Sequence, residues 1–302
     1  MKQPAAGPAH VTDDAFLGGG LRVLQPNEGY RAGIDALLLA AAAPLRAGRR
    51  ERVLDVGAGV GVVGLAVARR VPLCSVTLVE REPFLVELAR RNIARNGLEA
   101  RVRAIAADVS RRLDELDELR PDAEGFDHVL ANPPYHAEGA GTVSMAALKA
   151  AANVMPGGAL ARWARFMAAM TRPGGSATLI HRADALAGVL SAFAGRFGGL
   201  RVFPLYPRAG QSATRVLVQG RKGSHAPVEL RPGLVLHDRG NRFRPEVEAV
   251  LRHGAPLLLG EAAPRPAQKP AQKPAQKPAQ KPAKKPAKKP AKKPERNRPA
   301  RP

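Results

Sequence analysis

The stretch Arg52-Val53-Leu54-Asp55-Val56-Gly57-Ala58-Gly59-Val60-Gly61 is followed by the apolar-rich segment 62–70. Its β-branched and apolar beginning predicts a buried strand, its glycines predict a tight loop, and the segment after it predicts a helix. A strand, a glycine loop and a helix form a nucleotide-binding turn, because missing Cβ atoms let a ligand approach the backbone amides at the helix N-terminus. The stretch therefore predicts an α/β fold with a nucleotide-like ligand at this turn.

The segments outward from this turn alternate between strand and helix patterns. Strands are predicted at 76–80, 102–107, 126–131, 175–181, 200–205 and 214–219, with a short strand or hairpin at 12–24. Helices are predicted at 34–43, 62–70, 83–96, 110–119, 159–171 and 186–197. Repeated strand and helix units that end in a hairpin predict an α/β, doubly wound, Rossmann-like sheet of seven strands whose last strand is antiparallel.

The glycine loop leaves two cofactor classes open. Gly59, Gly61 and Gly64 match the dinucleotide fingerprint, with Glu80 about twenty residues further on, so a nicotinamide enzyme is one candidate. Asp55 favours S-adenosylmethionine, because a carboxylate before the first glycine suits a cationic, amine-bearing ligand and repels a pyrophosphate. No obvious hydride-transfer apparatus follows, which also favours S-adenosylmethionine.

Three further carboxylates are candidates for cofactor contact. Glu80 ends a predicted strand and is placed to accept both ribose hydroxyls. Asp108 ends the next strand and can accept a hydrogen bond from an adenine amino group, a role compatible with capping the following helix. Asp35 is either a residue that the helix dipole favours or the cap of a loop that closes over the cofactor.

The turn Asn132-Pro133-Pro134-Tyr135 directly follows the predicted strand 126–131. Each proline fixes φ and lacks a backbone donor, so strand pairing stops there. The Asn132 side chain and the Pro133 carbonyl are two converging acceptors that suit an exocyclic or amide NH2 group, and Tyr135 offers a flat face to a planar substrate. The turn holds no strong base, which fits an amine that loses its proton after alkylation. A plain surface turn is the alternative.

Residues 136–158, after this turn, are rich in small residues and predict a substrate lid. Trp163 shares helical spacing with Phe166 and Met167, which predicts a core contact rather than a base-stacking platform. No Cys or His spacing fits a metal site, so no metal is expected and His181 is predicted to pack at a strand end.

The net charge of +22 over 302 residues is unevenly distributed. Residues 261–302 carry 14 Lys and Arg against two Glu, a net charge of +12, in a period-four repeat of Ala-Gln-Lys-Pro and Ala-Lys-Lys-Pro. This composition predicts a disordered tail that is either an electrostatic tether for nucleic acid or a solubilising segment without a partner. The other half of the excess charge lies on the rest of the chain.

Several features predict a soluble, cytoplasmic protein. The first twenty residues lack the continuous apolar region of a signal peptide, and the apolar run 36–43 is too short to span a bilayer. Cys74 is the single cysteine, which argues for a reducing compartment, and its apolar neighbours predict a buried strand position.

These features together resemble the class I S-adenosylmethionine-dependent methyltransferases. Within that class the chain looks like the tRNA valine-1 adenine-N6 methyltransferase family, which acts on the anticodon-loop adenine just 3′ of the anticodon. The residues that carry the resemblance are Asp14-Ala15-Phe16-Leu17-Gly18-Gly19, Gln25-Pro26, Gly29-Tyr30-Arg31-Ala32-Gly33-Ile34-Asp35, residues 53–61, Glu80, Asp108 and residues 132–135. The likeness runs from about residue 13 to 223 and excludes the tail.

The resemblance implies S-adenosylmethionine as the cofactor and RNA, in particular tRNA, as the partner. The cofactor-binding residues would be Tyr30, Arg31, Asp35, Asp55, Gly57, Gly59, Gly61, Glu80, Asp108 and Asn132, and the catalytic ones Asn132, Pro133, Pro134 and Tyr135. The expected domains are an N-terminal strand, loop and helix closing over the cofactor at 1–44, a class I methyltransferase core at 45–223, an extension of that core at 224–260 and the tail at 261–302.

One departure leaves the target base open. His136 stands where relatives commonly carry another aromatic residue, and an Asn-Pro-Pro-aromatic-His sequence also resembles the ribosomal RNA guanine-N2 methyltransferases. A DNA adenine methyltransferase or a protein glutamine methyltransferase would use the same turn. The non-enzyme alternative is a nucleic-acid-binding protein with a degenerate cofactor fold.

Overall fold

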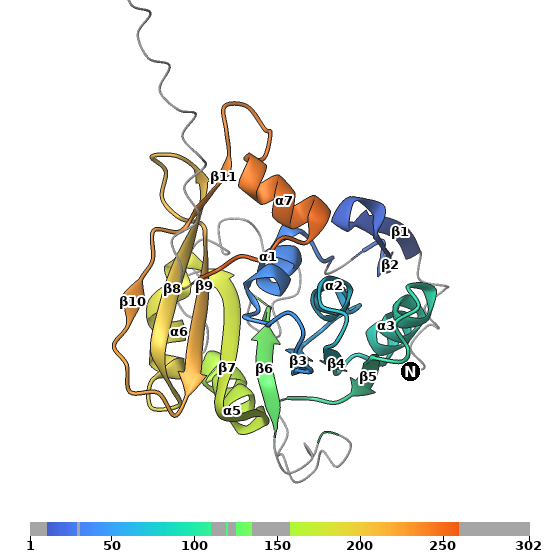
Figure 1. Cartoon of the computed structure of the whole chain (residues 1–302), viewed down its shortest axis with the longest axis horizontal. Coiled ribbons are helices and arrows are strands. Elements are labelled where there is room, and N and C mark those ends of the chain that lie inside the picture. Colours follow the sequence, from blue (N-terminus) through green and yellow to red (C-terminus); the bar gives the residue numbers. More distant parts are fainter. Residues whose placement is uncertain (1–10, 29–30, 110–118, 120–124, 135–157, 260–302) are drawn as a thin grey trace, which may run out of the picture. The chain divides into compact units, whose positions relative to one another are not determined.

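The computed structural model describes residues 11–28, 31–109, 119, 125–134 and 158–259 (Figure 1). Tyr30, Tyr135, His136 and the predicted tail lie outside the described residues. So do nearly all of the predicted helix 110–119 and of the predicted lid.

A mostly parallel sheet forms the centre of the fold (Figure 1). Its main strands are β3 (Arg52–Val56), β4 (Ser75–Glu80), β5 (Val102–Ala106), β6 (Phe126–Ala131), β7 (Thr171–Arg182), β8 (Phe197–Arg208) and β9 (Arg215–Lys222), in the spatial order β5-β4-β3-β6-β7-β9-β8. Strand β9 is antiparallel to both of its neighbours, whereas β3 to β7 pair in parallel. The predicted doubly wound sheet with an antiparallel last strand is confirmed.

Helices cover both faces of this sheet. The first face carries α1 (Ile34–Ala42), α2 (Val62–Arg70), α3 (Pro83–Arg95) and α7 (Pro245–His253), and the second carries α5 (Ala159–Met170) and α6 (Leu186–Phe193). Side chains along β3 alternate between the two cores, with Val53 in the first and Leu54 and Val56 in the second. Leu54 and Val56 flank Asp55, whose side chain therefore points toward the first face.

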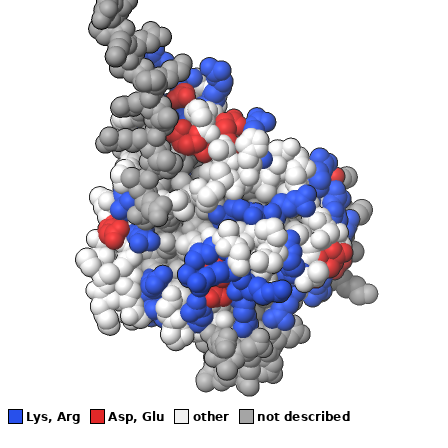
Figure 2. All heavy atoms as spheres, in the orientation of Figure 1, with Lys and Arg blue, Asp and Glu red and all other residues white. Residues whose placement is uncertain are grey.

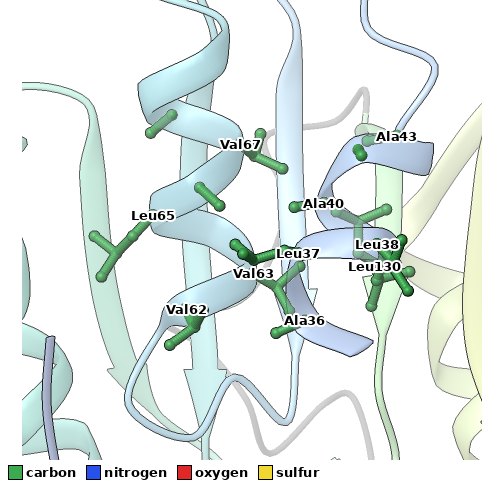
Figure 3. Close-up of a cluster of buried hydrophobic side chains, with 14 of the residues drawn as sticks. Ala36, Leu37, Leu38, Ala40, Ala43, Val62, Val63, Leu65, Val67 and Leu130 are labelled. Atoms are coloured by element: carbon green, nitrogen blue, oxygen red, sulfur yellow. The ribbon is translucent and has the colours of Figure 1, made fainter. Parts of the chain in front are cut away.

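The first core is tightest where α1 packs beside α2 (Figure 3). Small residues of α1, such as Ala36 and Ala40, lie next to Val63 and Val67 of α2, while Leu38 meets Leu130 of β6. Leu38 and Leu130 are fully buried. Because the apolar face of α1 is filled by Ala and Leu, the helix axis can lie close to α2 and bring its N-terminus toward the glycine loop.

The N-terminal segment is a hairpin of β1 (Val11–Phe16) and β2 (Leu21–Pro26), as predicted from its glycines. Two amides of α3 hold this hairpin in place. Asn92 bonds both the N–H and the carbonyl of Leu24, at 2.7 and 3.0 Å, and Asn96 bonds both groups of Arg22, at 3.0 and 2.7 Å. The side chains, four residues apart on one helix face, thus pair with alternate residues of β2 much as a neighbouring strand would.

Some predicted elements need correction. Helix α6 ends at Phe193 rather than at residue 197, because Gly195 adopts φ 72° and Phe197 already begins β8. Within the described residues the sheet has nine strands rather than the predicted seven, since the short strands β10 (Glu229–Leu230) and β11 (Leu234–His237) add to β8 in parallel.

Two smaller points concern burial and hydropathy. Cys74 is buried, immediately before β4 rather than within it. Among the described residues, no helix is long and apolar enough to cross a membrane.

Candidate functional site

The carboxyl edge of the sheet brings the predicted site residues into one row. Val56 pairs with Val79 on one side and with Ala131 on the other, so the next residues along the three strands, Glu80, Gly57 and Asn132, stand level with one another. Neighbouring strands are about 4.8 Å apart, so the row spans roughly 10 Å. Asp108 extends it beyond Glu80, because β5 ends opposite Glu80 at Ala106.

The glycine loop has a backbone that only glycine adopts readily. Gly57, Gly59 and Gly61 have φ values of 65°, 56° and 94°. The Ala58 N–H bonds the Val79 carbonyl at 2.9 Å, and the Gly61 N–H bonds the Ala58 carbonyl at 2.9 Å, so the loop folds back over the end of β4. The start of α2 is thereby presented at the sheet edge without side chains in front of it.

Asp55 lies buried beneath this loop. Its Oδ2 accepts the Gly64 N–H of α2 at 2.9 Å, which joins the strand to the helix that follows it. Burial raises the pKa of the Asp55 carboxyl to about 7; the hydrogen bond from Gly64 opposes this shift, and the charge of Glu80 adds to it. A cation bound near Asp55 would favour its ionised form.

Glu80 organises the same loop from the end of β4. Its Oε2 accepts the Gly59 N–H at 2.8 Å, and its Oε1 accepts the N–H groups of Arg81 and Glu82 at 2.8 and 3.0 Å. The side chain is half-buried, and a carboxylate has about four acceptor positions. A carboxylate beside a glycine loop fits a ligand with ribose hydroxyls, as the sequence predicts.

Gly57 also makes room for an aromatic ring that the sequence placed only in the core. A Cβ at Gly57 would lie 2.4 Å from the Trp163 ring, so this ring rests directly against the loop from α5. Trp163 packs on the second core and is half-buried. The core prediction for Trp163 therefore holds, but it omits the contact with the loop.

Asn92 is a site-supporting residue that the sequence reading missed. It is fully buried, and its Nδ2 donates to the Val60 carbonyl of the glycine loop at 3.0 Å as well as to Leu24 of β2. One side chain thus connects the N-terminal hairpin, α3 and the loop. The signal available in the sequence was an asparagine on the apolar face of a helix, one residue before the buried Ile93.

Arg31 is held by the N-terminal hairpin. Its guanidinium donates to the Thr12 hydroxyl at 2.8 Å and to the Pro26 carbonyl at 2.8 Å, and it pairs with Asp14 at 2.5 Å. Gln25 reinforces the same corner by donating to Asp14 at 2.7 Å and accepting the Ala32 N–H at 2.8 Å. These contacts fix the entry into α1 rather than meeting the glycine loop.

Asp35 lies at the carboxyl edge, in the first turn of α1. It pairs with Arg215 at 2.9 Å, and Arg215 opens β9 opposite Arg182, the last residue of β7. The pair ties the start of α1 to the far side of the sheet. Asp35 thus shares an edge with Gly57 and Asn132 while its carboxylate is engaged by an arginine.

The turn after β6 leaves the sheet beside the glycine loop. Asn132 is half-buried, Pro133 is buried and Pro134 is exposed. Asn132 stands level with Gly57 in the neighbouring strand, so the predicted amine-binding group and the predicted cofactor loop are adjacent. Among the described residues, no group of three His, Cys, Asp or Glu side chains could hold a metal ion.

Comparisons with known proteins indicate the family of this chain. A family model, the methyltransferase small domain, matches residues 33–167. A solved structure described as a predicted O-methyltransferase, protein Atu636 from Agrobacterium tumefaciens, is 35% identical with a TM-score of 0.62, and the match covers 74% of this chain and 98% of that one.

Two curated relatives match a shorter part of the chain. The tRNA1(Val) (adenine(37)-N6)-methyltransferase of Shewanella sp. (strain W3-18-1) is 32% identical over 113 residues, 37% of this chain and 44% of the relative. The ribosomal RNA small subunit methyltransferase C of Pasteurella multocida (strain Pm70) is 33% identical over 132 residues, 42% of this chain and 35% of the relative. The chain thus spans less than half the length of these curated relatives.

The sheet order, the glycine loop and these similarities define an α/β methyltransferase. The chain belongs to the class I S-adenosylmethionine-dependent methyltransferases, and S-adenosylmethionine is its cofactor. The site fits this cofactor, because a loop with three glycines, Gly57, Gly59 and Gly61, lies between the buried carboxyl group of Asp55 and the carboxylate of Glu80, which suits ribose hydroxyls.

The comparisons and the carboxylate of Asp55 favour S-adenosylmethionine over a nicotinamide cofactor. Gly64 completes the dinucleotide fingerprint, and its missing Cβ serves helix-to-sheet packing, as the third glycine of that fingerprint does, since a Cβ there would lie 2.2 Å from the Leu78 side chain. The carboxylate of Asp55 meets the Gly64 N–H in the first turn of α2, and its charge would repel a pyrophosphate at that helix end.

Proposed function

We propose that this protein methylates an exocyclic amino group of a nucleic-acid base, and specifically N6 of an anticodon-loop adenine in tRNA. The observation that carries the proposal is the register of β3 with β6, which sets Asn132 and Pro133 next to Gly57. An amine held by that turn lies within about one strand spacing of the cofactor loop.

The chain's own residues supply positioning in this reaction. S-adenosylmethionine, when bound, supplies an electrophilic methyl group on its sulfonium. The Asn132 side chain and the Pro133 carbonyl accept the two protons of the target NH2, which turns the nitrogen lone pair toward the methyl group. Tyr135 stacks on the extruded base, and the buried Pro133 keeps the turn rigid. The glycine loop, Asp55 and Glu80 would hold the cofactor, and the methylated amine would lose its proton to solvent, because the turn holds no strong base.

The support for RNA as the substrate comes from charge and from the relatives. The net charge of +22 suits a polyanion, and the matching curated proteins are tRNA and ribosomal RNA methyltransferases. The basic segment 261–302 would add a salt-sensitive, sequence-independent contact. A cytoplasmic site of action is part of the proposal.

A second candidate is guanine N2 in ribosomal RNA. It is favoured by His136 after the Asn-Pro-Pro-Tyr turn and by the ribosomal RNA methyltransferase among the relatives. The chemistry and the roles of Asn132 and Pro133 are the same for both bases. The tRNA adenine is preferred because the segment Gly29-Tyr30-Arg31-Ala32-Gly33-Ile34-Asp35 points to that branch.

The substitution Asn132→Ala tests the proposed role of the turn. We expect turnover on tRNA to fall at least 100-fold, because one of two acceptors for the amine is lost, while the Kd of S-adenosylmethionine changes less than about threefold. Methyl transfer under single-turnover conditions and calorimetric cofactor binding measure the two quantities. The matched control is Asn241→Ala, which removes an exposed amide outside the turn and should retain most of the activity. Wild-type rates in Asn132→Ala would refute the role.

A further inference from the structure

Exposed arginines gather at the amino edge of the sheet, opposite the candidate active site. Arg46, Arg49 and Arg50 lie in the loop between α1 and β3, and Arg69 lies in the last turn of α2; all four are exposed. The α1–β3 loop ends where β3 begins, whereas Gly57 follows the other end of the same strand. We call these four residues the amino-edge arginines.

Hydrogen bonds connect the segments that carry the amino-edge arginines into one surface. Arg70, next to Arg69, donates to the carbonyls of Ala40 and Ala43, both at 2.9 Å, at the end of α1. The Ser75 N–H bonds the Glu51 carbonyl at 3.0 Å, which joins the turn after α2 to the loop before β3. The amino-edge arginines therefore stand on a packed part of the fold.

Two neighbouring arginines, Arg70 and Arg101, bind backbone carbonyls of the fold, whereas three of the four amino-edge arginines have no such contact among the described residues. Arg70 is engaged by the end of α1, and Arg101 donates to the Ala68 and Val71 carbonyls at 2.9 and 3.3 Å. Cations at these helix ends are expected from the helix dipole alone. Arg49, Arg50 and Arg69, in contrast, form no ion pair with any carboxylate of the described residues.

The surrounding acids offset only part of this charge. Glu51 is buried, accepts the Arg46 N–H at 2.8 Å and pairs with the Arg46 guanidinium at 3.4 Å, and Asp127 is paired with Arg172 at 2.6 Å. Figure 2 shows Lys and Arg side chains gathered over the part of the molecule where Figure 1 places α1, α2 and β3, with few acidic side chains among them. The result is a surface of excess positive charge.

We propose that the amino-edge arginines bind backbone phosphates of the substrate RNA at a distance from the reacting base. This inference rests on the proposed function and specifies it: the substrate must be a folded RNA large enough to reach both edges of the sheet. Strand β3 has five residues, so the two edges are separated by roughly 17 Å, far more than one nucleotide. Phosphate contacts of this kind position an RNA without reading its sequence.

The test replaces two neighbouring cations in the full chain, Arg49→Gln together with Arg50→Gln. Binding of a fluorescent full-length tRNA transcript is measured by anisotropy over a series of salt concentrations. We expect the Kd near physiological salt to rise about tenfold or more, and the slope of log Kd against log salt to fall by about two. The kcat/KM for a short anticodon stem-loop, which reaches the catalytic edge alone, should stay within about twofold of wild type.

The matched control removes two exposed arginines elsewhere, Arg239→Gln together with Arg242→Gln. Its tRNA Kd should change less than the Kd of the amino-edge variant, and thermal unfolding should be the same for both variants and wild type. An unchanged tRNA Kd in the amino-edge variant would overturn the inference. An equal rise of the tRNA Kd in the control variant would also overturn it, and so would an equal fall of kcat/KM for the stem-loop in the amino-edge variant. Binding is read without activity, so a wild type that binds tRNA but methylates none contradicts the proposed function alone.

Discussion

Asp55 is a buried carboxyl group whose ionisation links the cofactor loop to the stability of the fold. Burial raises its pKa from 3.8 to about 7 in the folded chain. The folded state therefore holds the proton more tightly than the unfolded state. The stabilisation that the protonated Asp55 carboxyl provides is therefore complete below pH 3.8, and it is lost as the pH rises through about 7.

The substitution Asp55→Asn tests this linkage. An asparagine oxygen can still accept the Gly64 N–H, but the side chain no longer ionises. We expect the free energy of unfolding of wild type to fall, relative to that of the variant, as the pH rises from about 4 to about 8. Urea unfolding of both proteins at a series of pH values measures the difference.

Asp127 provides a control of opposite sign. Burial alone would raise its pKa, but hydrogen bonds from the Arg52 N–H and the Arg172 guanidinium outweigh burial and lower it. Its contribution is present above the unfolded pKa and is lost as the pH falls. For Asp127→Asn, we expect the difference from wild type in the free energy of unfolding to change at acid pH. If it does, but the corresponding difference for Asp55→Asn does not change with pH, the burial argument for Asp55 is contradicted.

At the scale of elements, helix α3 connects the N-terminal hairpin to the site. The Asn92 side chain bonds Leu24 of β2 and Val60 of the glycine loop, whereas the Asn96 side chain bonds Arg22 of β2 and the Asn92 carbonyl. The two asparagines therefore share one task, and only Asn92 reaches the loop. The hairpin and the cofactor loop are predicted to respond together when Asn92 is changed.

The substitution Asn92→Ala is expected to lower the free energy of unfolding by about 1–3 kcal/mol, because buried backbone groups lose their partners. It should also raise the Kd of S-adenosylmethionine several-fold, since the loop loses a support. Denaturant unfolding and calorimetry measure these effects. The control Asn96→Ala should cost less stability and leave the Kd of the cofactor near wild type. Equal changes in cofactor affinity for both variants would show that the Val60 contact has no special role.

At the scale of the whole molecule, local patterns were enough to predict the sheet and the cofactor loop. Strand β6 and helix α2 have the predicted bounds, because their apolar periods and their proline and glycine neighbours are local signals. The sequence also placed Gly57, Glu80 and Asn132 at the ends of predicted strands, and the parallel pairing of the structure brings those ends to a common edge. The division of the chain at residues 44, 223 and 260 stays a prediction.

The features that sequence reasoning missed depend on distant partners. Asn92 lies 68 residues from Leu24, so no short window links the two. The contacts of Arg31 with Thr12 and Asp14 across the hairpin corner were missed for the same reason, and its contact with the cofactor stays a prediction. The strands β10 and β11 are too short for a periodic signal, and their place is decided by the free edge of β8.

The measurement that tests the central claim most directly is transfer of a tritiated methyl group from S-adenosylmethionine to total tRNA, total ribosomal RNA and genomic DNA, followed by nucleoside chromatography. We expect label in tRNA, as N6-methyladenosine. Label as N2-methylguanosine in ribosomal RNA would keep the fold and the role of Asn132 but overturn the choice of base. Label in DNA alone would contradict an RNA methyltransferase. The absence of label from all three pools, for a protein that binds S-adenosylmethionine, would also contradict it and would point to other substrates.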